Sequence, residues 1–172
     1  MSADLTTGTP SVPIWRMVAG AAFGYIACAV VVLVTTIALG AALGPDGVFE
    51  PGTYRSKPSF ELLNMALGVL AAVLGGAIAW LMGRRVGTVI LVVVLFVGGG
   101  ISGARTLGAQ AARTEPYEPR PDGTWLQLMD GAMANTQQDA FYLMGMPFAG
   151  ALGALLGAGL ASRITRPKAP TA

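Results

Sequence analysis

The chain contains no histidine and a single cysteine, Cys28, among its 172 residues. The lack of histidine excludes zinc sites of the Cys/His type, haem ligation by His, and His-based acid or nucleophilic catalysis. One cysteine cannot form a disulfide within the chain. Charged residues are also scarce, at 12%, and no basic run of the kind that binds nucleic acid is present. These deficits predict a protein without a catalytic site, a cofactor, a metal or a nucleic-acid partner.

Four long apolar segments fill most of the chain. Apolar residues make up 53% of the sequence, and 24 glycines accompany them. Each segment is close to the 20 residues or so that a helix needs to cross a bilayer. The predicted spans cover residues 17–44, 58–83, 86–104 and 137–162. The sequence therefore predicts an all-α integral membrane protein, a four-helix transmembrane bundle in contact with the lipid bilayer.

The bundle is expected to form one domain, residues 16–165, between two tails. Residues 1–15 are rich in Ser, Thr, Gly and Pro and have no apolar period, which predicts a flexible tail. Residues 166–172 form a basic tail that contains two prolines. The longest connection, an outer loop at residues 105–136, joins the third and fourth spans.

Basic residues indicate the orientation of the chain. Arg84 and Arg85 occupy the tight turn between the second and third spans, and the C-terminal tail is basic. Basic residues in short loops favour the cytoplasmic side. Both termini are therefore expected in the cytoplasm. The abundance of Ala, Gly and Arg suggests a bacterium with a GC-rich genome, and so its plasma (inner) membrane.

The outer loop is predicted to carry a short helix. Thr124 and Gln127 make a capping box, and the residues after Thr124 form an apolar face that begins with Trp125. We expect this interfacial helix to lie on the outer membrane surface or across the mouth of the bundle. A second box, Thr136 with Asp139, is expected to begin the fourth helix.

Three spans have a face of small residues. In lipid, small side chains allow two backbones to approach closely, so these faces are expected to pack against other helices. On the second span, eight residues share one arc: Glu61, Asn64, Gly68, Ala72, Gly75, Gly76, Ala79 and Gly83. On the first span the small face is Gly20, Gly24, Ala27, Val31, Thr35, Ala38 and Ala42. On the fourth span it is Ala149, Gly150, Gly153, Gly157 and Ala161.

The third span differs, because residues 88–97 contain neither Gly nor Ala. This part is expected to face lipid. The triplet Gly98 to Gly100 follows it, and two interpretations remain open. The triplet either makes a close helix contact near the outer surface or acts as a hinge that exposes backbone to a cavity.

Two polar residues lie on the small face of the second span. Glu61 follows Pro58 in the first helical turn, where the helix dipole favours a carboxylate, so a capping and packing role is expected. Pairing with Arg105 or another basic residue of the outer side, and ion handling, are the alternatives. Asn64 lies one turn deeper and needs a hydrogen-bonding partner on a neighbouring helix. The candidate intramembrane polar and packing residues are Glu61, Asn64, Gly68, Gly75, Gly153 and Gly157.

Three functions are compatible with these features. The favoured one is a non-enzymatic structural, accessory or assembly component of a membrane complex, with protein partners at the small-residue faces and the 105–136 loop. The alternative is a small transporter or channel formed by a homo-oligomer, with Glu61, Asn64, Thr35 and the glycine triplet on the path. The third is an enzyme that acts on a lipid-borne substrate. Its acid would come from Glu115, Glu118, Asp122, Asp130 or Asp139.

Overall fold

The computed structural model describes residues 12–114 and 117–165, and both ranges are helical with no β-strand. The predicted N-terminal tail, apart from residues 12–15, lies outside the described residues, as do the 166–172 tail and Glu115. The elements are α1 (Ile14–Leu43), α2 (Pro45–Val48), α3 (Pro58–Val93), the π-helix η1 (Val94–Gly98), α4 (Gly99–Ala112), α5 (Trp125–Asn135) and α6 (Ala140–Ile164).

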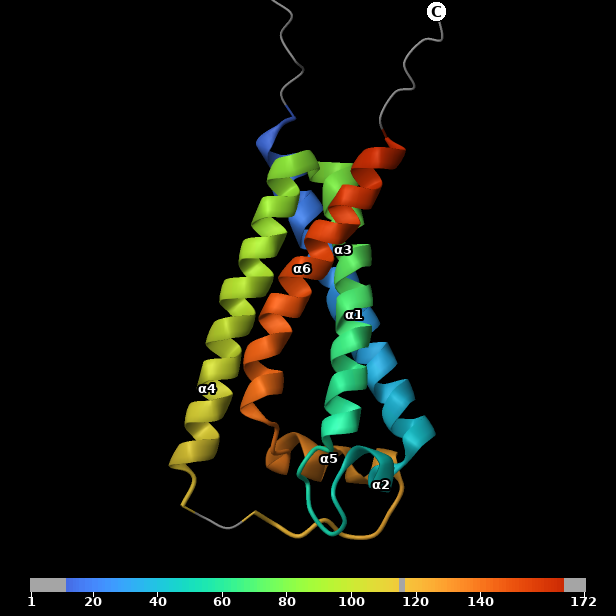
Figure 1. Ribbon diagram of the computed structural model, residues 1–172, viewed down its shortest axis with the longest axis vertical. Helices are drawn as coiled ribbons and strands as arrows, with labels where there is room; N and C mark the ends of the chain where they lie inside the picture. The colour runs from blue at the N-terminus through green and yellow to red at the C-terminus, as the bar shows by residue number, and fades with distance from the viewer. Residues whose placement is uncertain (1–11, 115–116, 166–172) are drawn as a thin grey trace, which may run out of the picture.

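Three helical runs are long and apolar enough to cross a membrane: Ile14–Leu43, Pro58–Ala112 and Ala140–Ile164. The second run has 55 residues and joins α3, η1 and α4. Its backbone leaves the helical region at Arg84, where φ is 54° and ψ is −149°. At the top of Figure 1 the chain reverses direction, so that α4 runs beside the rest of the bundle and back toward α5.

The two ends of the bundle differ in composition. The start of α1 and the end of α6 lie at the same end as the reversal of α3, whereas α2 and α5 lie at the opposite end (Figure 1). Within the described residues, the charged side chains at the first end are all basic: Arg16, Arg84, Arg85 and Arg163. The second end holds most of the acidic residues and a small hydrophobic core.

Close backbone contacts join α3 to both α1 and α6. A β-carbon on Gly24 of α1 would lie 2.5 Å from the carbonyl oxygen of Gly75, and one on Gly153 of α6 would lie 2.7 Å from that of Val69. Such distances are too short for any side chain. All eight residues of the small face expected on α3 are buried. α3 is therefore the central helix, and α1 and α6 pack on its small face.

The small face of α1 was predicted correctly only in its first half. Gly20 and Gly24 are buried, but the burial then continues at Cys28 and Gly40, whereas Ala38 and Ala42 are exposed. Gly20, Gly24, Cys28 and Gly40 are separated by multiples of four residues, while a helix turns every 3.6. The contact therefore winds around α1 and does not follow one straight face.

The third span does not simply face lipid, which corrects the prediction from its lack of Gly and Ala. Thr88 and Leu91 are buried, and the Leu91 side chain packs beside Gly24 of α1. The contact forms because a glycine on the partner helix makes the space that a large residue fills. Of the glycine triplet, Gly99 packs against Pro147 of α6, while Gly98 and Gly100 have open space around them.

Two helix boundaries differ from the prediction. α4 continues to Ala112 and not to residue 104, because Leu107, Gln110 and the alanines that follow are good helix formers even where hydropathy falls. The expected box of Thr136 and Asp139 is also wrong. Thr136 ends α5, where its hydroxyl donates to the carbonyl of Ala132, and Asp139 is the N-cap of α6, which begins at Ala140.

A compact cap closes the end of the bundle opposite the Arg84 reversal. We define the cap as α2, the connection 49–57, α5 and residues 136–139. Its hydrophobic core contains Val48, Phe49, Tyr54 and Ala132, together with Phe60 from the start of α3. The Thr124 and Gln127 capping box begins α5, with the Thr124 amide donating to Gln127 Oε1 at 2.9 Å. The indole of Trp125 stacks on Phe49 at 5.8 Å between ring centroids.

The contact of α3 with α6 predicts opposite effects for two glycines of one helix. A β-carbon on Gly157 would collide with the carbonyl oxygen of Val73, whereas one on Gly159 would meet open space. Gly157→Ala should therefore destabilise the protein by about 1–3 kcal/mol through overpacking. Gly159→Ala should be neutral or slightly stabilising, because Ala favours a helix by about 1 kcal/mol over Gly. Thermal unfolding in detergent, followed by circular dichroism, measures both; equal Tm values would contradict this contact.

Candidate functional site

Asn64 joins three helices through its side-chain amide. Its Nδ2 donates to the hydroxyl of Tyr142 on α6 at 2.6 Å, and its Oδ1 accepts from the hydroxyl of Thr36 on α1 at 2.8 Å. Asn64 is buried, at 7% exposed, and Tyr142 is also buried. A buried amide needs such partners because a lost hydrogen bond leaves a desolvated polar group. We call Thr36, Asn64 and Tyr142 the polar junction.

Glu61 lies one turn from Asn64, toward the cap, and is 5% exposed. Its Oε1 accepts from the backbone amide of Asp139 at 3.1 Å. Asp139 is the N-cap of α6, and Glu61 itself lies in the first turn of α3. The carboxylate is therefore close to the amino-terminal ends of two helices, where the helix dipoles favour negative charge.

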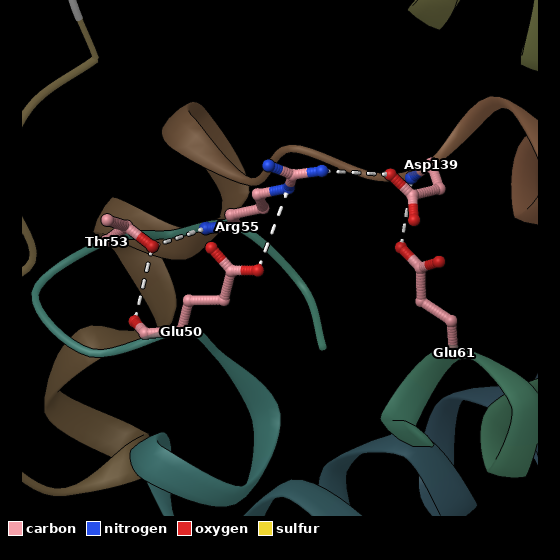
Figure 2. Close-up of polar contacts among 5 residues, drawn as sticks. All are labelled: Glu50, Thr53, Arg55, Glu61 and Asp139. Carbon is pink, nitrogen blue, oxygen red and sulfur yellow. Dashed lines mark hydrogen bonds and ion pairs between the residues drawn. The ribbon is translucent and has the colours of Figure 1, made fainter. Parts of the chain in front are cut away.

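Arg55 links this carboxylate site to the cap. Its guanidinium lies between two carboxylates, with 3.7 Å from Nη2 to Asp139 Oδ1 and 3.9 Å from Nε to Glu50 Oε1. Figure 2 shows the chain of contacts from Glu50 through Arg55 and Asp139 to Glu61. The Arg55 and Glu50 side chains are about half exposed, so these ion pairs contribute little to stability by themselves. Their effect is to hold the 49–57 connection over the start of α6.

Backbone hydrogen bonds join the same two segments. The Ser56 amide donates to the carbonyl of Gln137 at 2.9 Å, and the Gln137 amide donates to that of Tyr54 at 3.1 Å. Together with Arg55, they fix the connection between α1 and α3 against the connection between α5 and α6. The cap and the two polar residues of α3 therefore form one continuous structure.

The sequence identified Glu61 and Asn64 but not their partners. The expected alternative partner of Glu61 was Arg105 or another outer-side base, whereas in the structure the Asp139 amide donates to Glu61 and the outer-side base Arg55 pairs with the Asp139 carboxylate. Thr35 was expected on the polar path, yet its hydroxyl donates to the carbonyl of Val31 within its own helix at 2.7 Å. Thr36, one residue later, makes the contact with Asn64. The only sequence signal for Tyr142 is a hydroxyl near the cap end of an apolar helix.

The remaining candidate residues separate into packing glycines and exposed acids. Gly68 lies against Met146 of α6, and the other three glycines, Gly75, Gly153 and Gly157, make the backbone contacts described above. Of the loop acids that the structure describes, Glu118, Asp122 and Asp130 are exposed, while Asp139 pairs with Arg55. In residues 12–114 and 117–165, no three Asp, Glu or Cys side chains gather as a metal site would require.

Comparisons with known proteins leave the geometry as the only guide to function. No model of a protein family matches the chain, and neither the curated proteins nor the solved structures give a match.

The polar junction predicts a measurable loss on removing one hydroxyl. Tyr142→Phe keeps the ring but takes away the acceptor of the Asn64 amide, so the free energy of unfolding should fall by about 0.6–2 kcal/mol. Tyr25→Phe is the matched control, since Tyr25 lies half exposed on α1. Unfolding in mixed micelles measures both variants. A Tyr142→Phe variant as stable as Tyr25→Phe would contradict the role of the junction.

Proposed function

We propose that the chain crosses the plasma membrane of a bacterium four times, as a four-helix bundle, with both termini and the Arg84 turn in the cytoplasm. The helical run Pro58–Ala112 supports two crossings, because its 55 residues extend about 80 Å against an apolar core of about 30 Å. The reversal at Arg84 lies near its middle. The basic residues at that end agree with the preference of basic loops for the cytoplasm.

In this arrangement the cap lies outside, and α5 is an interfacial helix at the outer membrane surface. Leu128 and Ala132 of α5 are buried in the cap, while Leu126 is 67% exposed. An exposed leucine on a helix that lies across the bundle end is suited to contact with the acyl chains next to the headgroups. This supports a position of α5 that is partly in the cap and partly in the interface.

Labelling of single cysteines tests the four crossings. In a Cys28→Ala background, Asp122→Cys should react with a membrane-impermeant maleimide added to intact cells. Arg85→Cys and Ala172→Cys should react only after the cells are permeabilised, because both lie in the cytoplasm in the proposed topology. Reaction of Arg85→Cys in intact cells, or an Asp122→Cys protected in them, would contradict the arrangement.

For the activity, we propose a non-enzymatic structural or accessory role in a membrane complex. The observation that carries the proposal is an unused small-residue stripe on α4, formed by Gly100, Ala104 and Gly108. These residues recur every four positions, and β-carbons on the two glycines would meet open space. In lipid, such a stripe lets the backbone of another helix approach closely. Within the described chain, no other helix covers it.

The use of the intramembrane polar groups supports this role over transport. A transporter needs polar groups that its substrate can reach. Here Asn64 bonds to Thr36 and Tyr142, and Glu61 bonds to the start of α6. These groups thus stabilise the contacts between helices, and the outward surfaces of α4 and the cap are left to bind partner proteins.

Gentle extraction of the tagged protein at native expression level, followed by mass spectrometry, tests the proposed role. We expect a partner protein in stoichiometric amount. Ala104→Leu, which places bulk on the stripe, should lower the recovered partner by about tenfold, as overpacking of 1–3 kcal/mol implies. Ala109→Leu is the control, because Ala109 is also exposed on α4 but outside the stripe.

A pure monomer or homo-oligomer would contradict the accessory role and favour transport. The transport alternative would then predict that Glu61→Gln abolishes flux into liposomes while assembly persists, since Gln retains an acceptor for the Asp139 amide but carries no charge. Unchanged flux in this variant would exclude Glu61 from a transport path.

A further inference from the structure

An open cleft separates α1 from η1 and α4 in the half of the bundle nearer the cap. Its volume is about 600 Å³. The floor includes Gly68 of α3 and Met146 of α6, and the two walls come from α1 and from the segment between Leu95 and Thr106. We propose that this cleft binds one acyl chain of a lipid from the cap-side leaflet, with the ester groups of that lipid at the polar rim.

The length of the cleft matches one leaflet. On α1 its lining residues extend from Tyr25 to Thr36, and on the opposite wall from Leu95 to Thr106. Each wall thus covers eleven helical steps, or about 17 Å at 1.5 Å per residue. Half of the apolar core of a bilayer is about 15 Å thick. An acyl chain that enters from the headgroups would therefore end where the cleft ends.

The far end of the cleft is closed by a contact between its two walls. The Leu91 side chain is fully buried and lies 3.1 Å from the position of a β-carbon on Gly24. Further from the cap, a β-carbon on Gly87 would lie 3.1 Å from the carbonyl oxygen of Met17. These contacts mean that a transmembrane helix of a partner could not continue along this cleft into the other leaflet. A ligand with the length of one leaflet fits the space instead.

Most polar residues of the cleft lie toward the cap, where Thr36, Thr106 and Gln138 are found. The far end is lined by Cys28 and Leu95 and by one residue with a hydroxyl, Tyr25. The lining residues are all uncharged. Apolar walls with a few polar groups at one end are typical of sites for amphiphilic ligands. Hydroxyl and amide groups suit the ester carbonyls of a glycerolipid, while the absence of charge from the described lining leaves the headgroup outside.

The polar junction provides a specific donor at this rim. Tyr142 is one of the residues that line the cleft, and its hydroxyl accepts a hydrogen bond from the Asn64 amide. Its own hydrogen is then free to donate, and no acceptor for it lies within reach among the described residues. An ester carbonyl at the rim would accept this hydrogen bond. The residues that join α1, α3 and α6 would thereby also position the lipid.

Two glycines of α6 allow the cleft to be filled with a matched control. Gly150 lines the cleft and Gly159 lies outside it, and a β-carbon on either would meet open space. Gly150→Leu should fill the cleft without moving the helices, whereas Gly159→Leu adds the same bulk to a lipid-facing surface.

The proposed lipid site depends on the membrane placement proposed above. The cysteine labelling tests that placement separately.

The experiment uses the full chain reconstituted in phosphatidylcholine vesicles that contain a phosphatidylcholine with a diazirine at the end of one acyl chain. After photolysis, we expect crosslinks concentrated on Cys28 and Leu95, which line the end of the cleft far from the cap. Gly150→Leu should lower this labelling by about tenfold, because a leucine and an acyl chain cannot occupy one space without overpacking. Gly159→Leu should leave it unchanged.

Three results would overturn the proposal. Labelling spread evenly over all lipid-facing surfaces of the wild type, with Cys28 and Leu95 no higher than Leu74 or Leu160, would mean that the cleft holds no distinct lipid. Equal labelling of the cleft in Gly150→Leu and Gly159→Leu would mean the same. The wild-type pattern needs no variant, so a Gly150→Leu protein that fails to fold leaves the proposal testable. A partner helix crosslinked to Cys28 or Leu95 in native membranes, in place of lipid, would also contradict it.

Discussion

The close approach of the α3 backbone to α1 and α6 is the constraint on which the rest of the structure depends. In a bilayer, apolar side chains gain little by leaving lipid, so van der Waals contact between backbones must hold the helices together. Gly75 allows that contact on the α1 side, and Gly153 and Gly157 allow it on the α6 side. Because α3 has one small face, both neighbours must pack on it. This fixes the order α1, α3, α6 in the bundle.

The position of the two intramembrane polar residues follows from that packing. Glu61 and Asn64 continue the small face of α3 toward the cap, so they enter the space between helices and avoid lipid. Hydroxyls from both neighbours then reach Asn64, and the backbone amide of Asp139, the N-cap of α6, reaches Glu61. The glycines bring the helices close, and the hydrogen bonds set their register where the glycines end. The cap packs on this fixed end.

Much of the helical content and the packing face of α3 could be predicted from the sequence, because both depend on local patterns of size and hydropathy. The partners of the polar residues could not. Thr35 and Thr36 are adjacent, and about 100° of rotation decides which reaches Asn64. Because the contact winds around α1, exposing Ala38 and burying Gly40, the side of α1 that faces α3 changes along the helix. The role of Arg55 depends on how two connections far apart in sequence fold together.

α4 makes limited contact with the other helices. The two surfaces that no described helix covers, the cleft and the small-residue stripe, therefore both lie beside it. The first part of the returning helix packs tightly, with Leu91 beside Gly24, but beyond η1 its contacts with α6 rest mainly on Gly99 and Gly103. The π-helix ends at Gly98, the first glycine of the triplet, and such an insertion changes which side of a helix faces its neighbours. α4 therefore leaves α1 and opens the cleft, and its outer side carries Gly100, Ala104 and Gly108. One change in direction thus produces both the space proposed for a lipid and the stripe proposed for a partner.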